Sequence, residues 1–471
     1  MRPEDELGVL IESGLSDWQI LQQDESGHAA LQLRGRWVYP EAFKKAVVYV
    51  RLVREASGEA LSLECDWRRA LTRKNGTWTC RLQGIPAGGL YRLETCLNLD
   101  GGAIEWSMRG DMRHHVGVGD IWILSGQSNS EGHGRSPVED GPELGVHVLR
   151  ASGQWALATH PLNDATDTLY PANRIYCNPS HSPWLHFAKL LRRELGYPIG
   201  LIPASLGASP LAAWHRKTDG YLFANMLNYV RAAGGSRGVA WYQGESDIGV
   251  EQRHSYARRF GEFVADLRRS LKREDLPVIT VQLNRYIGQD FDAVEMHRGW
   301  EAIREAQRQL ARRDPHVFVV ASFGALLADG IHNDAAGNML IGRRAAAAAL
   351  GGAHGRKLKY LHPDCTSARA KGTCLELRFA HVDTRLHFEN NIAAQIPFAV
   401  RDDAGAVEIT GWSASGPDGL QLHLARELGA NAVVTGAPSA CPPTSIPCDI
   451  SGYLPMLGFT QKIEGRSGAA G

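Results

Sequence analysis

The chain has 471 residues, which is more than one ordinary domain holds, so we expect two or three domains. Hydrophobic residues make up 44% and charged residues 22%, values typical of soluble globular proteins. Lysine plus arginine and aspartate plus glutamate both number 51, and this balance gives no reason to expect nucleic acid or an anionic membrane as a partner.

The first residues and the lengths of the apolar runs give an expectation for where in the cell the protein is located. Residues 1–6 read Met-Arg-Pro-Glu-Asp-Glu, which is acidic and lacks the apolar core of a signal peptide. No apolar run approaches the length that spans a bilayer. A cytoplasmic location is therefore favoured over a secreted or periplasmic one, although a chain trimmed of its leader would look the same.

Residues 1–117 are expected to form an N-terminal β-sandwich domain. Short strand-forming runs are separated by Gly, Pro and Asn, a pattern typical of sandwiches. The predicted strands include 30–33, 46–52, 61–65 and 91–97. The pair His114-His115 invites a metal site, but adjacent residues of one strand point to opposite faces, so a solvated linker is favoured.

Residues 118–354 alternate between apolar strands and amphipathic helices, which predicts a doubly wound parallel sheet with helices on both faces. The predicted strands are 121–124, 199–203, 238–242, 277–283 and 316–321. The predicted helices are 184–195, 222–233, 251–273, 297–313 and 335–350. Gly196 is suited to end the first of these helices. In such folds the active site lies beyond the carboxyl ends of the strands.

Residues 355–462 return to a strand pattern and predict a C-terminal β-rich domain, a second sandwich. Its predicted strands include 375–379, 385–388, 395–400 and 420–423. Residues 463–471 are small and polar and are expected to form a flexible tail.

The cysteines do not suggest a metal site. None of their spacings matches a CxxC zinc pattern. Two pairs, Cys365/Cys374 and Cys441/Cys448, can each close a small loop in an oxidising compartment, but free thiols are favoured without a signal peptide. The full set is Cys65, Cys80, Cys96, Cys177, Cys365, Cys374, Cys441 and Cys448.

Ser128 is the first candidate for chemistry. It follows the predicted strand 121–124 in a turn rich in small polar residues, Gly126-Gln127-Ser128-Asn129. At the start of a helix its backbone N–H points outward, and the helix dipole favours negative charge nearby. Such a serine is either a helix cap or a nucleophile, and a nucleophile needs a base and an oxyanion site.

Two further loops carry candidate oxyanion donors. Gly207, after the strand 199–203, allows close backbone approach, so its N–H can donate to an oxyanion; a tight turn is the alternative. Gln243, after the strand 238–242, carries a neutral amide donor. Glu245 can orient a partner in the site or pair with an arginine such as Arg304, and a structural role is favoured.

The loop Asp329-Gly330-Ile331-His332 supplies a candidate base. With Asp and His three residues apart, the carboxylate can fix the imidazole tautomer while the other ring nitrogen faces the nucleophile. Asp334 is expected to cap the helix 335–350. Four polar loops follow four predicted strands in order, which favours one shared catalytic site over four unrelated polar loops.

These residues resemble the SGNH hydrolase superfamily and, within it, the sialate O-acetylesterase-like carbohydrate esterases. The resemblance covers about 118–350 and extends more weakly to 17–22 and 119–122. It rests on these segments: Gly126-Gln127-Ser128-Asn129, Ala204-Ser205-Leu206-Gly207-Ala208-Ser209 with Trp214, Trp241-Tyr242-Gln243-Gly244-Glu245-Ser246, and Asp329-x-x-His332.

The resemblance implies a flavodoxin-like core flanked by the two β-domains. It also implies Ser128 as nucleophile, His332 as base and Asp329 as its orienting residue, without a metal or cofactor. The oxyanion hole would comprise the N–H groups of Ser128 and Gly207 and the Gln243 side chain, with Asn129 and Glu245 as support. The chain departs from the family where Ser130 replaces the common Met and Ala208 the common Gly. Both changes are expected to reshape the pocket.

We therefore expect a serine carbohydrate O-acetylesterase that acts through an acyl-enzyme on an acetylated sugar, either sialic acid or a plant-type glycan. The alternatives are a general small-ester SGNH esterase and a catalytically silent carbohydrate-binding protein. Trp214 and Arg216 are candidate substrate contacts. Other arginine and aromatic residues also lie near loop ends, so the sugar and its acetylated position stay open. The oligomeric state is open as well. Those other residues are Arg135, Arg174, Arg285, Arg298, Trp184 and Tyr286.

Overall fold

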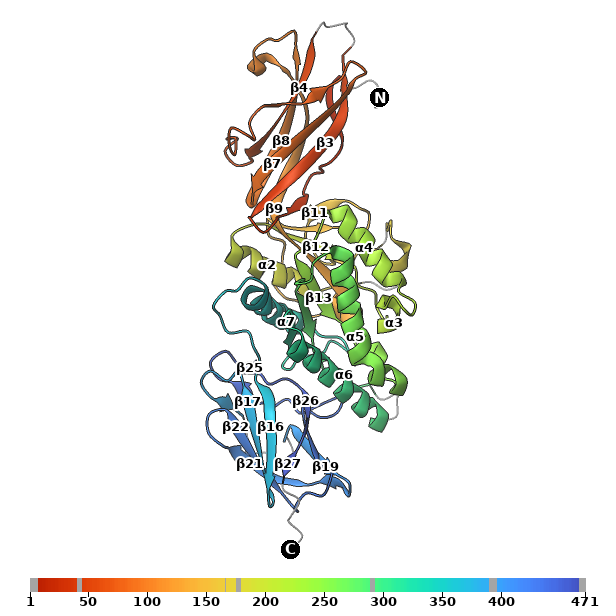
Figure 1. Cartoon of the computed structure of the whole chain (residues 1–471), viewed down its shortest axis with the longest axis vertical. Coiled ribbons are helices and arrows are strands. Elements are labelled where there is room, and N and C mark those ends of the chain that lie inside the picture. Colours follow the sequence, from red (N-terminus) through yellow and green to blue (C-terminus); the bar gives the residue numbers. More distant parts are fainter. Residues whose placement is uncertain are drawn as a thin grey trace.

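The protein is elongated, with β-strands at both ends and a sheet covered by helices in the middle (Figure 1). The ends of the chain lie at opposite ends of the molecule. The structure, a computed structural model, describes residues 7–39, 45–165, 167–174, 179–288, 293–388 and 396–465. Among these residues no helix is long and apolar enough to cross a membrane. The predicted mixed α/β class is confirmed.

The N-terminal part holds two groups of strands that share one hydrophobic core, built on residues such as Leu33, Val50, Trp78 and Leu93. One sheet is antiparallel, in the order β1 (Gly8–Ser13), β3 (His28–Val38), β7 (Thr77–Pro86) and β6 (Leu71–Thr72). The other group comprises β4 (Ala46–Arg54), β5 (Arg68–Arg69), β8 (Gly88–Leu99) and the first half of β9 (Met108–Gly126). The short β2 (Ile20–Gln22) pairs with β9 in parallel.

The strand predicted at 61–65 is wrong. This segment turns instead, with the backbone N–H groups of Cys65 and Asp66 both donating to Ser62 O. Leu63, which the alternating pattern would bury, is 93% exposed. The segment forms backbone hydrogen bonds with Leu52 of β4 only at Leu61 and Cys65. Because the turn between these two residues prevents a continuous ladder, the alternation does not place Leu63 on a buried face.

The strand β9 belongs to both the N-terminal and the central sheet. Its residues 108–118 pair with β8, and its residues 120–126 pair with the central strands β12 (Ile199–Pro203) and β13 (Gly238–Tyr242). The expected domain boundary at 117/118 therefore lies inside one continuous strand. The division of the chain into domains stays a prediction.

The pair His114-His115 lies where β9 is distorted. His115 has φ of 57°, and the register with β8 shifts beside it. This distortion breaks the alternation of side chains, so the Nδ1 atoms of both histidines lie 3.0 Å from the Glu55 carboxylate. The expectation that the two side chains point to opposite faces is wrong.

The central sheet is parallel over six strands, in the order β10-β12-β9-β13-β14-β15, and β11 adds an antiparallel edge. Without β10 the order is 2-1-3-4-5, that of flavodoxin-like folds, with the order reversing at β9. Helices α2 and α7 lie on one side of the sheet, and α4 and α5 on the other (Figure 1). The remaining strands are β10 (Val146–Leu149), β11 (Trp155–Leu157), β14 (Val278–Val281) and β15 (Val317–Val320).

The predicted helices are confirmed to within a few residues. The helix predicted at 184–195 has those same bounds and ends at Gly196, whose φ of 78° suits a glycine. Asp334 caps α7 by accepting a hydrogen bond from the N–H of Gly337. The described α-helices are α1 (Ser128–Glu131), α2 (Trp184–Leu195), α3 (Leu211–Trp214), α4 (Tyr221–Ala233), α5 (Val250–Leu271), α6 (Ala293–Arg313) and α7 (Ala335–Ala348).

The C-terminal part holds several separate sheets around a third hydrophobic core, which includes Leu377, Leu422 and Phe459. The largest sheet has the order β21 (Ile409–Ala414), β22 (Gly419–Leu424), β17 (Cys374–Ala380), β16 (Asp364–Lys371) and β27 (Glu464–Gly465). A second sheet comprises β20 (Gly405–Val407), β19 (Phe398–Asp402), β23 (Val433–Gly436) and β26 (Phe459–Lys462). A third comprises β18 (Leu386–His387), β24 (Cys448–Asp449) and β25 (Leu454–Pro455). Whether the two end regions are sandwiches of the expected arrangement stays a prediction.

The expected tail from 463 onward still contains β27, which pairs in parallel with Arg369 and Ala370 of β16. The rest of this tail lies outside the described residues. The seven described cysteines are free thiols, and Cys177 lies outside the described residues.

Candidate active site

The loops with the candidate residues meet where three neighbouring parallel strands end. After β9 the chain continues to Ser128, after β12 to Gly207 and after β13 to Gln243. Backbone hydrogen bonds join the turns: Leu206 N–H donates to Gly126 O, and Gln127 N–H donates to Tyr242 O, each at 3.0 Å. The reversal of strand order at β9 opens this position, as expected for the fold.

Ser128 is the first residue of the four-residue helix α1 (Ser128–Glu131), and it is half-buried. The turn before it requires a glycine, because Gly126 has φ of 131° and a Cβ there would lie 2.1 Å from Tyr242 O. Among the described residues the Ser128 hydroxyl forms no hydrogen bond with His332. Bonds of this kind often tighten only when substrate is bound.

Asp329 and His332 form the expected pair. Asp329 Oδ2 lies 2.8 Å from His332 Nδ1, and Asp329 Oδ1 accepts hydrogen bonds from the N–H groups of Ile331 and His332. Partial burial favours the protonated acid, but these hydrogen bonds outweigh it and lower the pKa of Asp329 to about 2. The carboxylate is therefore ionised at neutral pH and holds the proton on Nδ1, which leaves Nε2 of His332 free to act as a base.

Asn129 connects the serine turn to the histidine loop. Its amide donates to Glu245 Oε1 at 2.8 Å and to Ile331 O at 3.2 Å, and its Oδ1 accepts from Asn333 N–H at 3.0 Å. The residue after Ser128 is thus bonded to both neighbours of His332. This arrangement supports the expected positioning role of Asn129.

Glu245 is buried, and burial raises its pKa despite the hydrogen bond from Asn129. The suggested pairing with Arg304 is wrong. The Arg304 guanidinium donates to backbone carbonyls instead, among them Leu283 O and Ser439 O. Glu245 therefore holds Asn129, while Arg304 joins the middle of the molecule to its C-terminal part.

Gly207 lies beside the serine. A Cβ added at Gly207 would come 3.8 Å from Ser128 Cβ and 2.9 Å from Glu131 Oε2, so only a glycine fits without displacing Glu131. Among the described residues the N–H groups of Ser128 and Gly207 have no acceptor. Two unused backbone donors beside a serine at a helix start suit a developing oxyanion.

Gln243 does not offer a free donor, contrary to expectation. The residue is fully buried, and its Nε2 lies 2.7 Å from Asp247 Oδ2, 3.2 Å from Ser209 O and 3.3 Å from Gln127 Oε1. Its Oε1 accepts from the Tyr256 hydroxyl. Because an amide carries only two protons, these contacts already use its donors. Gln243 therefore joins the loops to one another.

The expected sugar contact at Trp214 is also wrong. Trp214 is fully buried, its Nε1 donates to Ser209 Oγ, and its ring packs edge-on against Trp241. Arg216 is exposed, and its guanidinium lies 5.6 Å from the Phe223 ring centroid on α4. Apolar packing of α3 against its neighbours explains why Trp214 faces inward.

The two departures from the family pattern lie in different environments. Ser130 is buried, where Trp184 Nε1 and Ser205 Oγ both donate to its hydroxyl, so it supports α1 from beneath and does not line an open pocket. Ala208 is exposed and has φ of 55°. The substitution at Ser130 therefore changes the support of the serine turn and not the pocket surface.

Sequence reasoning missed Glu131 and His133. Glu131 is fully buried and its Oε2 lies 3.0 Å from His133 Nε2. The ring of His133 stacks on that of His332, with centroids 4.5 Å apart. Their spacing, Glu-x-His directly after the serine turn, was the available signal, but only the fold brings the second histidine against the first.

Comparisons with known proteins show similarity to carbohydrate esterases. The family described as carbohydrate esterase, sialic acid-specific acetylesterase matches residues 118–351. A probable carbohydrate esterase of Arabidopsis thaliana is 28% identical over 209 residues, which span 39% of this chain and 77% of that protein. Human sialate O-acetylesterase is 26% identical over 217 residues, and the match spans 36% of this chain and only 39% of that enzyme.

A crystal structure of a carbohydrate acetylesterase from Xanthomonas citri covers 96% of this chain and 99% of its own, with a TM-score of 0.66 and 21% identity. At this identity the likeness concerns the fold, including both ends of the chain. The segment 118–351 is similar to the carbohydrate esterase family of sialic acid-specific acetylesterases, and these matches support an esterase, that is, a carboxylic ester hydrolase.

Proposed function

We propose that this protein is a serine O-acetylesterase that removes acetyl groups from an O-acetylated sugar. The observation that carries the proposal is the pair Asp329–His332, bonded at 2.8 Å and held next to the serine turn by Asn129. The similarity of segment 118–351 to sialic acid-specific acetylesterases supports an acetylated carbohydrate as substrate. Sialic acid and plant-type glycans are both candidate sugars.

In the proposed mechanism, His332 Nε2 takes the proton of the Ser128 hydroxyl as its oxygen attacks the ester carbonyl. Asp329 stays ionised and stabilises the imidazolium that forms. The N–H groups of Ser128 and Gly207 donate to the tetrahedral oxyanion. His332 then protonates the departing sugar hydroxyl, and the acetyl group remains on Ser128.

Deacylation repeats these steps with water as the nucleophile. His332 removes a proton from water, and the same two donors hold the second tetrahedral oxyanion. Acetate then leaves as His332 returns the proton to Ser128 Oγ. No step needs a group that this chain does not supply. Gln243 contributes by keeping the three loops together, since its donors are already used.

The test is acetate release from a panel of esters by the wild type, by Ser128→Ala and by Ser136→Ala, a control at an exposed serine. The panel contains acetylated sialic acid, acetylated xylan, acetylated xyloglucan and an aryl acetate. We expect Ser128→Ala to lose activity by at least about 10³-fold and Ser136→Ala to retain it. Equal rates of acetate release by the wild type and Ser128→Ala would rule out the serine mechanism. Activity on the aryl acetate alone would favour a general esterase, and glycan binding without any hydrolysis would favour a silent binding protein.

A further inference from the structure

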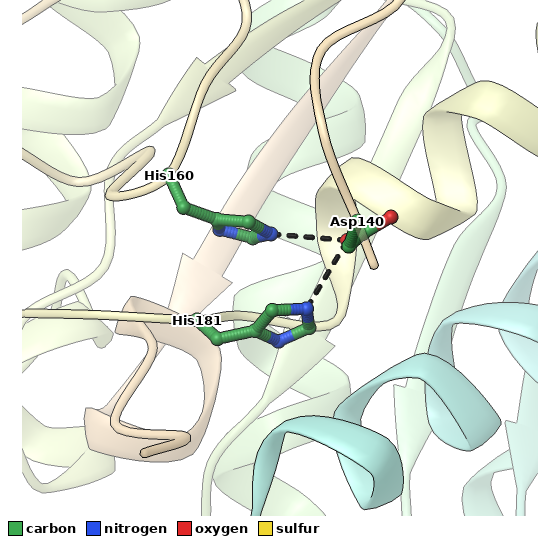
Figure 2. A group of neighbouring side chains, drawn as sticks. All are labelled: Asp140, His160 and His181. Carbon is green, nitrogen blue, oxygen red and sulfur yellow. Dashed lines mark hydrogen bonds and ion pairs between the residues drawn. The ribbon is translucent and has the colours of Figure 1, made fainter. Parts of the chain in front are cut away.

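A second cluster of polar side chains lies apart from the Asp329–His332 pair. Asp140 follows α1 on a long loop, His160 follows β11, and His181 precedes α2. The three side chains converge from these separate segments, with both imidazole rings directed at one carboxylate (Figure 2). We propose that Asp140, His160 and His181 bind one divalent transition-metal ion, with Zn²⁺ as the best match.

The distances within the cluster suit a metal centre. Asp140 Oδ2 lies 3.0 Å from His160 Nε2 and 3.1 Å from His181 Nε2. A tetrahedral Zn²⁺ with bonds of about 2.0–2.1 Å has ligand atoms about 3.3–3.4 Å apart. Each histidine Nε2 therefore needs to move away from Asp140 Oδ2 by only a few tenths of an ångström to admit the ion, and the three ligand atoms all lie within 4.8 Å of one another. Two imidazoles and one carboxylate favour Zn²⁺ over Mg²⁺ or Ca²⁺, which prefer oxygen ligands.

His181 supplies an independent observation. The residue is only 7% exposed, and among the described residues neither of its ring nitrogens forms a hydrogen bond. Its Nε2 lies 3.1 Å from Asp140 Oδ2, which is an ion pair only while the imidazole is protonated, and the contact lacks hydrogen-bond geometry. Buried polar atoms in folded proteins nearly always have a partner. A metal ion bound at Nε2 would supply one.

Lys189 lies close to the cluster but leaves the proposed ligand atom free. Its Nζ is 2.6 Å from Asp140 Oδ1 and also donates to Gly141 O, whereas both histidines approach Oδ2. His186 Nδ1 lies 3.5 Å from Oδ1 as well. Metal-binding carboxylates commonly hold a hydrogen-bonding partner on their second oxygen, which fixes their orientation. Lys189 and His186 fit that role.

The proposed site joins three loops and its ligands are largely buried, and a water molecule would complete its four-coordinate shell. The carbonyl of His181 accepts from Gly134 N–H at 3.0 Å and from Asn338 Nδ2 at 2.7 Å. Gly134 is adjacent to His133, whose ring stacks on His332. A bound ion would thus stabilise the loop that carries His133. The proposal does not depend on the serine mechanism.

The test uses the full chain, freed of metal with a chelator and then titrated with Zn²⁺ by calorimetry and with Co²⁺ by visible absorption. We expect one Zn²⁺ per chain, a rise in Tm on binding, and the intense Co²⁺ absorption of a four-coordinate site. His160→Ala and His181→Ala should each weaken Zn²⁺ binding by about tenfold or more. The double variant His114→Ala/His115→Ala, which removes the other histidine pair, should bind as the wild type does.

Two results would overturn the proposal: a wild type that binds Zn²⁺ no more tightly than His160→Ala does, or a Co²⁺ spectrum that His181→Ala leaves unchanged. Either would mean that Lys189 and the neighbouring histidines stabilise the Asp140 carboxylate without an ion. Circular dichroism identifies variants that fail to fold. If His181→Ala fails, His160→Gln, at the more exposed histidine, decides by the same titration.

Discussion

The ring of His133 stacks on the ring of His332, with centroids 4.5 Å apart and planes inclined by 20°. His133 is itself fixed by the buried carboxylate of Glu131 at 3.0 Å. The proposed base is therefore restrained on one ring edge by Asp329 and on one ring face by His133. Packing against a face limits rotation of the imidazole, which an acid–base catalyst must hold in one orientation.

We expect His133→Ala to lower kcat/KM by about tenfold, because the His332 ring loses its stacking partner. His133→Phe keeps a flat ring at the same position and should retain most of the activity. Steady-state hydrolysis of an aryl acetate across a range of pH measures both variants. If Phe were as damaging as Ala, the charge or hydrogen bond of His133 would be the relevant property, and a changed pH profile would reveal it.

Asp329→Asn should lower kcat by about 10³- to 10⁴-fold with little change in KM. The carboxylate that holds the proton on His332 Nδ1 and stabilises the imidazolium is lost, while the shape of the loop is kept. The side chain would still meet the N–H groups of Ile331 and His332 through its amide oxygen. A kcat of Asp329→Asn within tenfold of the wild-type value would show that Asp329 only shapes the loop.

The same carboxylate predicts a dependence of stability on pH. The pKa of folded Asp329, about 2, lies below its ordinary value of 3.8. Its contribution to stability is therefore fully present above about pH 4 and is lost as the pH falls through about 2. Urea unfolding of Asp329→Asn should accordingly show a smaller decline over this window than the wild type does. If the free energies of unfolding of the two proteins decline in parallel over this window, Asp329 does not make the predicted contribution.

Gln243→Ala distinguishes a loop-joining role from an oxyanion role. Removal of the amide leaves buried Asp247 and Tyr256 without one partner each, so the free energy of unfolding should fall by about 2–4 kcal/mol. The exposed Gln252→Ala is the control in the same urea titration. Unchanged stability with a loss of about 10²–10³ in kcat would instead restore Gln243 as an oxyanion donor.

Ala208→Gly should stabilise the protein by about 0.5–1 kcal/mol. Ala208 is exposed and has φ of 55°, a conformation that is unfavourable for alanine and open to glycine. No buried contact is lost. The free energy gained from relieving the backbone strain should therefore exceed the cost of the extra conformational freedom that glycine gives the unfolded chain. Thermal unfolding measures the effect, and an unchanged or lower Tm would show that the loop carries no such strain.

Much of the central fold followed from patterns along the chain. The strands 199–203 and 238–242 and the helix 184–195 have the bounds that apolar periodicity and Gly196 predicted. These are local properties, since a buried strand or an amphipathic helix is encoded within a few turns of chain. The segment 61–65 shows the limit: its alternation is as clear, but the chain turns there and forms only isolated backbone hydrogen bonds with Leu52 of β4.

The sequence by itself determined which residue types could perform ester hydrolysis, namely Ser128, Asp329 and His332, and on which loops they lie. The tertiary structure decided which of the supporting residues face the site. Gln243 and Trp214 lie in segments that match the family. The side-chain donors of Gln243 are nevertheless bonded to neighbouring loops, and the ring of Trp214 is buried. His133 and the Asp140 cluster became apparent only in space. The physical reason is that contacts between distant segments depend on packing, which no local pattern encodes.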